Sequence, residues 1–142
     1  KEQRAARKIL KKMGCASLES RTWRQMSQGE RQKMLFGRAL MGKPKALFLD
    51  EPCAGLDPIA RLDYLSFMES NAANPKAPAL ILVTHHVEEI TPSFTHALLL
   101  REGLVTASGP VAEVLTSAKL SETFGHPVRL RRRAGGYLLE EG

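Results

Sequence analysis

The sequence predicts an α/β fold built on a parallel sheet, and three observations carry this prediction. Two short apolar runs, at residues 46–49 and 79–84, are typical of strands buried on both faces of a parallel sheet. A helix is predicted between them, from Pro58 to about residue 73, with Asp57 as its N-cap. Each run ends directly in polar residues, where open α/β sheets bind their ligands.

The composition is that of one globular domain. The chain has 142 residues, 43% of them hydrophobic and 25% charged. No apolar run approaches the roughly 20 residues that a membrane helix needs. Residues 1–12 are charged and lack the apolar core of a signal peptide, so none is expected there. Cys15 and Cys53 have no metal-ligand spacing, and we expect both to remain reduced.

The remaining elements are short. Residues 1–13 read as an amphipathic helix, residues 15–26 as irregular, and residues 29–41 as a second helix. The apolar side of this second helix is predicted to carry Met34, Leu35, Ala39 and Leu40. A short helix at 87–90, a hairpin at 97–107, short helices at 110–115 and 120–124, and a second hairpin at 128–140 complete the chain.

Polar side chains that suit phosphoryl chemistry follow both apolar runs. Asp50 and Glu51 end the first run, and His85 follows the second, so all three are expected at one edge of the sheet. One carboxylate there can hold Mg²⁺, and the other can orient or deprotonate an attacking water. A histidine beside such a pair is a candidate functional group. An ordinary polar strand end is the alternative reading of the two carboxylates.

The start of the second helix allows two readings. Ser27 and Glu30 fit the capping box, in which each side chain accepts a hydrogen bond from the backbone of the other residue. A helix start is also an anion site, and Gly29 there allows a phosphate to approach the backbone closely. The two readings are compatible, and the stretch alone does not decide between them.

Four motifs in order resemble the ABC ATPase family over nearly the whole chain. Residues 26–30 match the signature L-S-G-G-Q at Ser27 and Gly29, and residues 47–52 resemble Walker B with its trailing glutamate. Residues 54–57 resemble the D-loop and residues 83–85 the switch region. Because all four motifs occur in the order found in the family, a chance match is a poor explanation. Met26, Gln28 and Glu30 depart from the family pattern, and a carboxylate at position 30 is less favourable near a phosphate.

The resemblance implies a role for each residue. Asp50 holds Mg²⁺ through its water shell, Glu51 is the general base, and His85 contacts the γ-phosphate of ATP. The signature residues Ser27, Gln28 and Gly29 bind ATP held by the opposite subunit, and Asp57 lies at the subunit interface. The fold implied is part of a P-loop NTPase sheet. It divides into a helical subdomain with the signature helix (1–43), an α/β core (44–100) and a small β/α C-terminal tail (101–142).

No phosphate-cradling loop of the form G-x-x-x-x-G-K-[ST] is expected in this chain. Residues 37–44 come near to it, but they end a helix and run into a strand, and Pro44 stands where the Ser or Thr belongs. The chain is therefore read as the C-terminal half of an ATP-binding domain, inactive alone, whose strands lack neighbours. We expect such a piece to be marginally stable, domain-swapped or prone to aggregation.

The function implied is ATP hydrolysis coupled to transport across a membrane. The partners implied are a second nucleotide-binding subunit, a transmembrane permease subunit and the N-terminal half of the same domain. The location implied is the cytoplasm, on the inner face of the cell membrane. The alternatives are a soluble ABC ATPase acting on the ribosome or nucleic acid, and a basic binding module using residues 129–133. Nucleic acid is not expected as a partner, because an amphipathic strand with a solvated basic face explains this cluster better.

Overall fold

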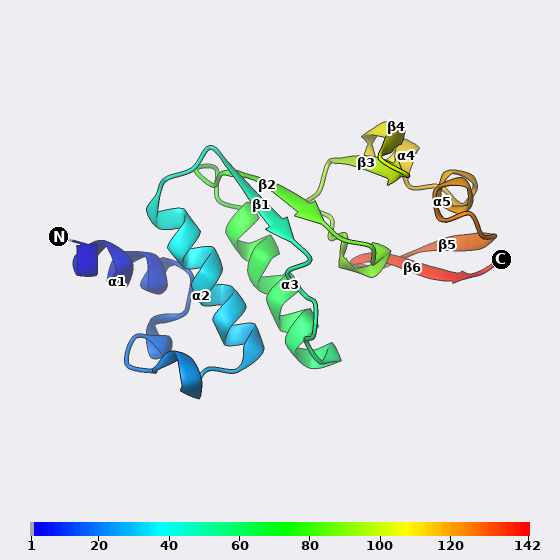
Figure 1. Ribbon diagram of the computed structural model, residues 1–142. Coiled ribbons are helices and arrows are strands. Elements are labelled where there is room, and N and C mark those ends of the chain that lie inside the picture. Colours follow the sequence, from blue (N-terminus) through cyan, green and yellow to red (C-terminus); the bar gives the residue numbers. More distant parts are fainter. Residues whose placement is uncertain (1) are drawn as a thin grey trace. The chain divides into compact units, whose positions relative to one another are not determined.

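The computed structural model describes residues 2–142 and divides the chain into two compact units. The first unit ends at Thr84, and the second extends from His85 to Gly142. Figure 1 shows helices α1 to α3 with strands β1 and β2 in the first unit, and the remaining strands and helices in the second. No helix within the described residues is long and apolar enough to cross a membrane.

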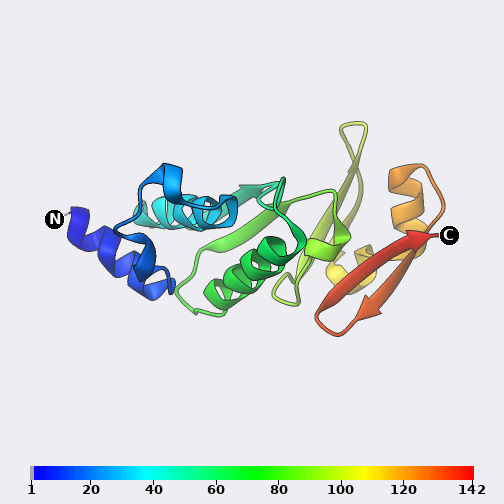
Figure 2. The same ribbon diagram turned by 90° about the horizontal axis from the view of Figure 1, so that it is seen from below.

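The first unit is a two-stranded parallel sheet with helices on one face. The strands β1 (Ala46–Asp50) and β2 (Ala79–Val83) pair in parallel, with Ala46 opposite Ala79 and Asp50 opposite Val83. The helices are α1 (Glu2–Lys12), α2 (Gln28–Met41) and α3 (Pro58–Ala72), with 3₁₀ turns at Ala16–Leu18 and Trp23–Gln25. In both views α2 and α3 lie side by side against the two strands (Figures 1 and 2). The predicted order of helices and strands is thus confirmed.

The prediction that the strands are buried on both faces is wrong for this structure. Burial alternates along each strand, and the faces turned to α2 and α3 carry Leu49 and, less deeply buried, Leu47, Leu80 and Leu82. The opposite face carries Phe48, whose side chain is 68% exposed, with Ile81 and Val83 also exposed. The continuous apolar sequence of each strand therefore places apolar side chains on both faces of the sheet. The helices of the first unit cover only one of these faces.

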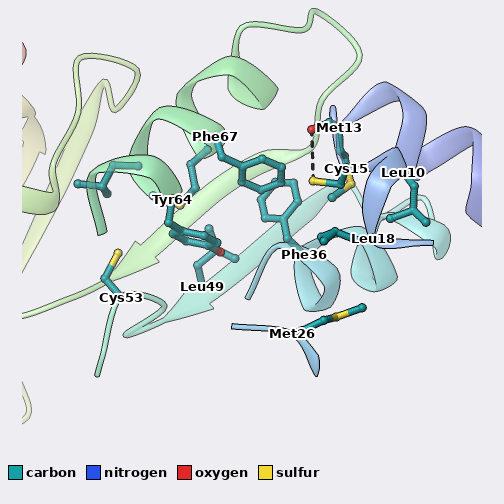
Figure 3. Close-up of a cluster of buried hydrophobic side chains, with 12 residues drawn as sticks. Leu10, Met13, Cys15, Leu18, Met26, Phe36, Leu49, Cys53, Tyr64 and Phe67 are labelled. Carbon is teal, nitrogen blue, oxygen red and sulfur yellow. Dashed lines mark hydrogen bonds between the residues drawn. The ribbon is translucent and has the colours of Figure 1, made fainter. Parts of the chain in front are cut away.

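The core of the first unit lies between the sheet and the helices (Figure 3). Tyr64 and Met68 of α3 are each 1% exposed, and the ring of Phe67 meets that of Phe36 edge to face at a centroid distance of 5.2 Å. Burial raises the pKa of the Tyr64 hydroxyl above its usual range, with Cys53 adding to the effect, so this side chain stays neutral.

One prediction for the apolar side of α2 is wrong. Leu35 is exposed, whereas its neighbour Phe36 is 3% exposed and lies in the core. Successive helix positions are about 100° apart, and Leu35 lies beyond the edge of the side of α2 that faces the core. Phe36 faces the core instead, and its larger ring fills the space beside Phe67.

The second unit consists of two antiparallel hairpins and two short helices. Strand β3 (His96–Arg101) pairs with β4 (Leu104–Pro110), and β5 (Val128–Arg133) pairs with β6 (Gly136–Glu141). Helices α4 (Val111–Val114) and α5 (Ser117–Phe124) connect the hairpins, and a 3₁₀ turn at Val87–Glu89 packs on β6. Both predicted hairpins are confirmed. The buried centre of this unit is formed by Val87, Val111, Leu115 and Leu120.

The central position of Met68 gives a test of the first core. We expect Met68→Ala to lower the free energy of unfolding by about 2–5 kcal/mol, because it leaves a cavity among fully buried side chains. Met41→Ala is the matched control: Met41 is 39% exposed at the end of α2, and the expected change is within about 0.5 kcal/mol. Urea denaturation of the complete protein that contains this chain measures both, and equal effects would contradict the assigned core.

Candidate functional site

The carboxylates Asp50 and Glu51 stand at the carboxyl end of β1, as predicted, and both are exposed. The backbone N–H of Glu51 donates to the carbonyl oxygen of Val83 at 2.9 Å, which extends the pairing with β2 by one residue. Glu51 then takes a left-handed backbone conformation, with φ of 42°. Residues other than glycine rarely adopt this region, and such strain gathers at functional sites. The turn that follows is closed by a hydrogen bond of 3.0 Å from Ala54 N–H to the Glu51 carbonyl oxygen.

The start of α2 is the capping box predicted from the sequence. Ser27 Oγ accepts a hydrogen bond from Glu30 N–H at 3.2 Å, and the Glu30 carboxylate accepts one from Ser27 N–H at 2.9 Å. The first N–H groups of an α-helix have no partner within the helix, and here these include those of Gln28 and Gly29. They remain the donors that this helix start can offer to an anion.

The carboxylate of Glu30, which is unfavourable near a phosphate, has two hydrogen-bond partners. Glu30 accepts the Ser27 N–H and also pairs with Arg21, whose Nη1 lies 2.7 Å from the Glu30 carboxylate. The backbone hydrogen bond from Ser27 lowers the pKa of Glu30, and the charge of Arg21 contributes. Arg21 was not predicted to be part of the site, because it lies in the stretch 15–26, which was expected to be irregular and contains the 3₁₀ turn at Trp23–Gln25.

Gln28 joins the helix start to the loop at residues 53–56. Its side-chain Nε2 donates to the carbonyl oxygen of Ala54 at 3.0 Å. The next residue, Gly55, has φ of 72°, and a Cβ atom there would lie 2.9 Å from the same Nε2. The contact therefore needs glycine at position 55 for both conformation and space. The sequence did not predict this contact, because Gln28 and Ala54 are 26 positions apart.

Gly29 and Asp57 both lie at the start of α3, Gly29 against Ala60 and Asp57 as the N-cap. Gly29 is buried beside α3: a Cβ atom added to it would lie 3.7 Å from the Cβ of Ala60, an ordinary van der Waals distance. Asp57 Oδ1 accepts hydrogen bonds from the N–H groups of Ile59 and Ala60, both at 2.9 Å. The predicted N-cap is confirmed. The structure thus brings together the helix start at 27–29, loop 53–56 and Asp57.

His85 belongs to the second unit, where it is the first residue, and its side chain is exposed. Its imidazole ring lies 4.1 Å from that of His86, measured between ring centroids. Along the chain it follows Thr84 and so comes two residues after the end of β2. Its proximity to Asp50 and Glu51 stays a prediction.

The segment 37–44 is not a phosphate loop, as the sequence indicated. Its first part is the last turn and a half of α2, Gly42 caps the helix, and the chain then enters β1. A phosphate loop requires the opposite order, from strand to helix.

The oxygen donors at the end of β1 suit a magnesium ion bound mainly through water and phosphate. Within residues 2–142, no group of three or more His, Cys, Asp or Glu side chains is arranged to hold a metal. Magnesium in nucleotide sites uses one or two carboxylates and keeps several waters, so the pair Asp50 and Glu51 fits this ion. The described residues do not offer a site in which protein side chains alone would hold the ion.

Comparison with known proteins gives one consistent answer. The family model for ABC transporters matches residues 1–54. An uncharacterized ABC transporter ATP-binding protein of Bacillus subtilis, YlmA, is 43% identical over 122 residues, which cover 86% of this chain and 46% of the relative. The molybdenum import ATP-binding protein ModC of Rhodopseudomonas palustris is 38% identical over 112 residues, 79% of this chain and 30% of that protein. The chain spans about half the length of the first of these curated relatives.

Solved structures agree on the fold. A metal-chelate type ABC transporter in an inward-facing conformation superposes with a TM-score of 0.83 at 23% identity, covering 96% of this chain and 56% of that one. The ADP conformation of an ATP-binding cassette of an ABC transporter gives a TM-score of 0.71 at 25% identity, covering 85% of this chain and 48% of the other. The α/β architecture is that of ATP-binding domains of the P-loop NTPase fold.

The contact between Gln28 and loop 53–56 can be tested by a double-mutant cycle. Gly55→Ala forces an unfavourable conformation and displaces the Gln28 amide, whereas Gln28→Ala removes only the hydrogen bond to Ala54. We expect the two effects on the free energy of unfolding to be non-additive by about 0.5–1 kcal/mol, because the same bond is lost in each variant. Urea denaturation of the single and double variants measures this coupling.

Gly103→Ala is the control for this cycle. Gly103 has φ of 79°, close to that of Gly55, but a Cβ atom there would meet nothing within 4 Å. Its effect should add to that of Gln28→Ala. Coupling of the same size in the control cycle would show that the non-additivity does not come from the contact.

Proposed function

Because the chain belongs to the family of ABC transporter ATP-binding domains, we propose that it is the C-terminal half of an ATP-hydrolysing transporter subunit. The observation that carries this proposal is the carboxylate pair at the end of β1, where Glu51 is held in a strained conformation and is followed by loop 53–56. The ATP hydrolysed drives the movement of a substrate across a membrane. Relatives named for molybdenum import support a transport role.

Each residue of the candidate site has a proposed task. Asp50 holds Mg²⁺ through water, and the ion neutralises phosphate charge when bound. Glu51 accepts a proton from the attacking water, for which an exposed carboxylate at a strand end is suited. His85 orients that water and contacts the terminal phosphate.

The start of α2 is proposed to meet ATP held by a second nucleotide-binding subunit. The N–H groups of Gln28 and Gly29 and the hydroxyl of Ser27 are donors for its terminal phosphate. The ion pair of Glu30 with Arg21 supports this task, because it reduces the negative charge beside the helix start. Asp57 lies at the same subunit interface. The hydrogen bond from Gln28 to Ala54 then couples phosphate contact at α2 to loop 53–56, the segment that links Glu51 to Asp57.

The remaining parts of the site lie outside these residues. We propose that an N-terminal half of the same domain supplies the phosphate cradle and covers the exposed face of β1 and β2. Residues 1–43 form the helical subdomain that docks on a transmembrane permease subunit, residues 44–100 form the catalytic core, and residues 101–142 form the tail. The location we propose for the subunit is the cytoplasm, at the inner face of the cell membrane.

The general-base role is tested in the complete protein that contains this chain. We expect Glu51→Gln to lower the rate of Mg²⁺-dependent ATP hydrolysis by about 10²–10⁴-fold, because the amide cannot accept the proton of the attacking water. Glu102→Gln is the matched control: Glu102 also has a left-handed backbone conformation, with φ of 52°, and lies in the turn between β3 and β4. Activity of the control should be unchanged. A Glu51→Gln protein with full activity would remove the assignment.

The chain of 142 residues is expected not to hydrolyse ATP by itself, since the site lacks a phosphate cradle. Phosphate release measured with and without Mg²⁺ tests this expectation. Glu51→Gln in the same chain is the control for contaminating ATPases. Turnover by the chain that Glu51→Gln abolishes would show that the site is complete within these residues.

A further inference from the structure

The segment 21–25 contacts the first turn of α2 at two points. Arg21 Nη1 lies 2.7 Å from Glu30 Oε1, and Arg31 Nε donates a hydrogen bond to the carbonyl oxygen of Trp23 at 3.0 Å. The Arg31 guanidinium also lies 5.5 Å from the ring centroid of Trp23, a cation–π arrangement. The backbone that carries Arg21 is therefore attached to the same helix turn as Glu30.

The conformation of this segment is fixed by its own hydrogen bonds. Arg21 N–H donates to the carbonyl oxygen of Leu18 at 3.1 Å, which closes the turn before the segment. The N–H and the hydroxyl of Thr22 both donate to Gln25 Oε1 at 3.0 Å, and Gln25 N–H donates back to the Thr22 carbonyl oxygen at 3.0 Å. Arg21 thus lies between two hydrogen-bonded turns, which limits where its side chain can reach.

Glu30 carries the acidic charge of the first turn of α2. The backbone hydrogen bond from Ser27 and the charge of Arg21 hold the pKa of Glu30 below its usual range, so the carboxylate is ionised at neutral pH. Its Oε2 atom accepts the Ser27 N–H at 2.9 Å, so the negative charge lies one hydrogen bond away from the helix start. Such a charge repels a phosphate at that start unless a cation offsets it.

The charge at position 30 has a structural benefit and an electrostatic cost. A carboxylate is a stronger acceptor for the Ser27 N–H than the amide of the Gln in the family signature. The amide, however, carries no charge and would not repel a phosphate. In this chain the guanidinium of Arg21 offsets the charge while the carboxylate keeps its bond to Ser27.

We propose that Arg21 is a positioning residue for ATP, which acts by pairing with Glu30 and so sets the affinity of the start of α2 for the terminal phosphate. This inference rests on the proposed function of that helix start, and it adds a residue six positions before Ser27 to the site. Arg21 and Glu30 form a matched pair. The loss of Arg21 is therefore harmful only while position 30 carries a negative charge.

A double-mutant cycle in the complete protein tests the proposal, with Mg²⁺-dependent ATP hydrolysis as the readout. We expect Arg21→Gln to raise KM for ATP by about tenfold with little change in kcat, because the unpaired charge of Glu30 disfavours the phosphate in ground state and transition state alike. Glu30→Gln should give a KM no higher than that of the unchanged protein, since its amide oxygen still accepts the Ser27 N–H. Adding Arg21→Gln to Glu30→Gln should change KM by less than about twofold.

Matched variants separate this pairing from basic charge in general and from a role in folding. Arg24→Gln removes the same charge from the 3₁₀ turn of the same segment and should leave KM within about twofold of the unchanged protein. Arg21→Lys keeps the charge and should retain most of the affinity. Higher salt should reduce the difference between Arg21→Gln and the unchanged protein, because it screens exposed charges.

Binding of ADP, measured by calorimetry, is the control for folding. ADP lacks the terminal phosphate, so every variant that folds should bind it as the unchanged protein does. A variant of Arg21 that has lost its fold would lose ADP binding too, whereas a variant that has lost only the pairing would not.

The inference is overturned if Arg21→Gln leaves KM for ATP unchanged, or if it raises KM equally with and without Glu30→Gln. It is also overturned if Arg24→Gln raises KM as much as Arg21→Gln does. The Glu51→Gln protein decides the proposed function separately. If Glu51→Gln abolishes hydrolysis and the cycle shows no coupling, the proposed function stands and the role of Arg21 falls. If Glu51→Gln keeps full activity, both fall.

Discussion

The parallel pairing of β1 with β2 is the constraint on which the candidate site depends. Because the two strands run in the same direction and in register from Ala46 to Asp50, their carboxyl ends reach the same edge. The hydrogen bond from Glu51 N–H to Val83 then carries the pairing one residue beyond β1, which fixes where the chain leaves the sheet. The turn after Glu51, loop 53–56 and the N-cap Asp57 of α3 come next along the chain, so their positions depend on where β1 ends. An antiparallel arrangement would have sent the polar ends of the two strands to opposite edges.

A second level of organisation comes from contacts between the starts of two helices. Ser27 and Asp57 each cap a helix with a side chain that could also serve a ligand, so the structural and functional readings of these residues are compatible. Gln28 and Gly29 join the two starts: Gln28 donates a hydrogen bond to Ala54, and Gly29 lies beside Ala60. The residues at positions 28 and 30, which depart from the family signature, therefore each have a hydrogen-bond partner in this chain: Ala54 for Gln28 and Arg21 for Glu30.

The features of this chain that could be predicted from its sequence are those with a local signal. Caps, hairpins and the two strands were predicted from residues close to one another, and the structure confirms them. The features that depend on distant neighbours were not predicted. The choice of Phe36 over Leu35, the exposed side of Phe48 and the bond from Gln28 to Ala54 each depend on elements that fold against them from elsewhere in the chain. The place of His85 relative to the carboxylates depends on the arrangement of two units, which no local pattern encodes.

The left-handed conformation of Glu51 has a consequence for the engineering of stability in this protein and for the substitutions that selection favours at this position. A non-glycine residue in that region costs roughly 1–2 kcal/mol, and Gly or Asn would tolerate it better. A selection for heat resistance that ignores turnover would therefore favour replacing Glu51, the residue proposed to activate water. A substitution of Glu51 that raises the free energy of unfolding would therefore lower the proposed catalytic activity. Consensus-based or thermostability-guided engineering should hold residue 51 fixed and seek its gains elsewhere in the chain.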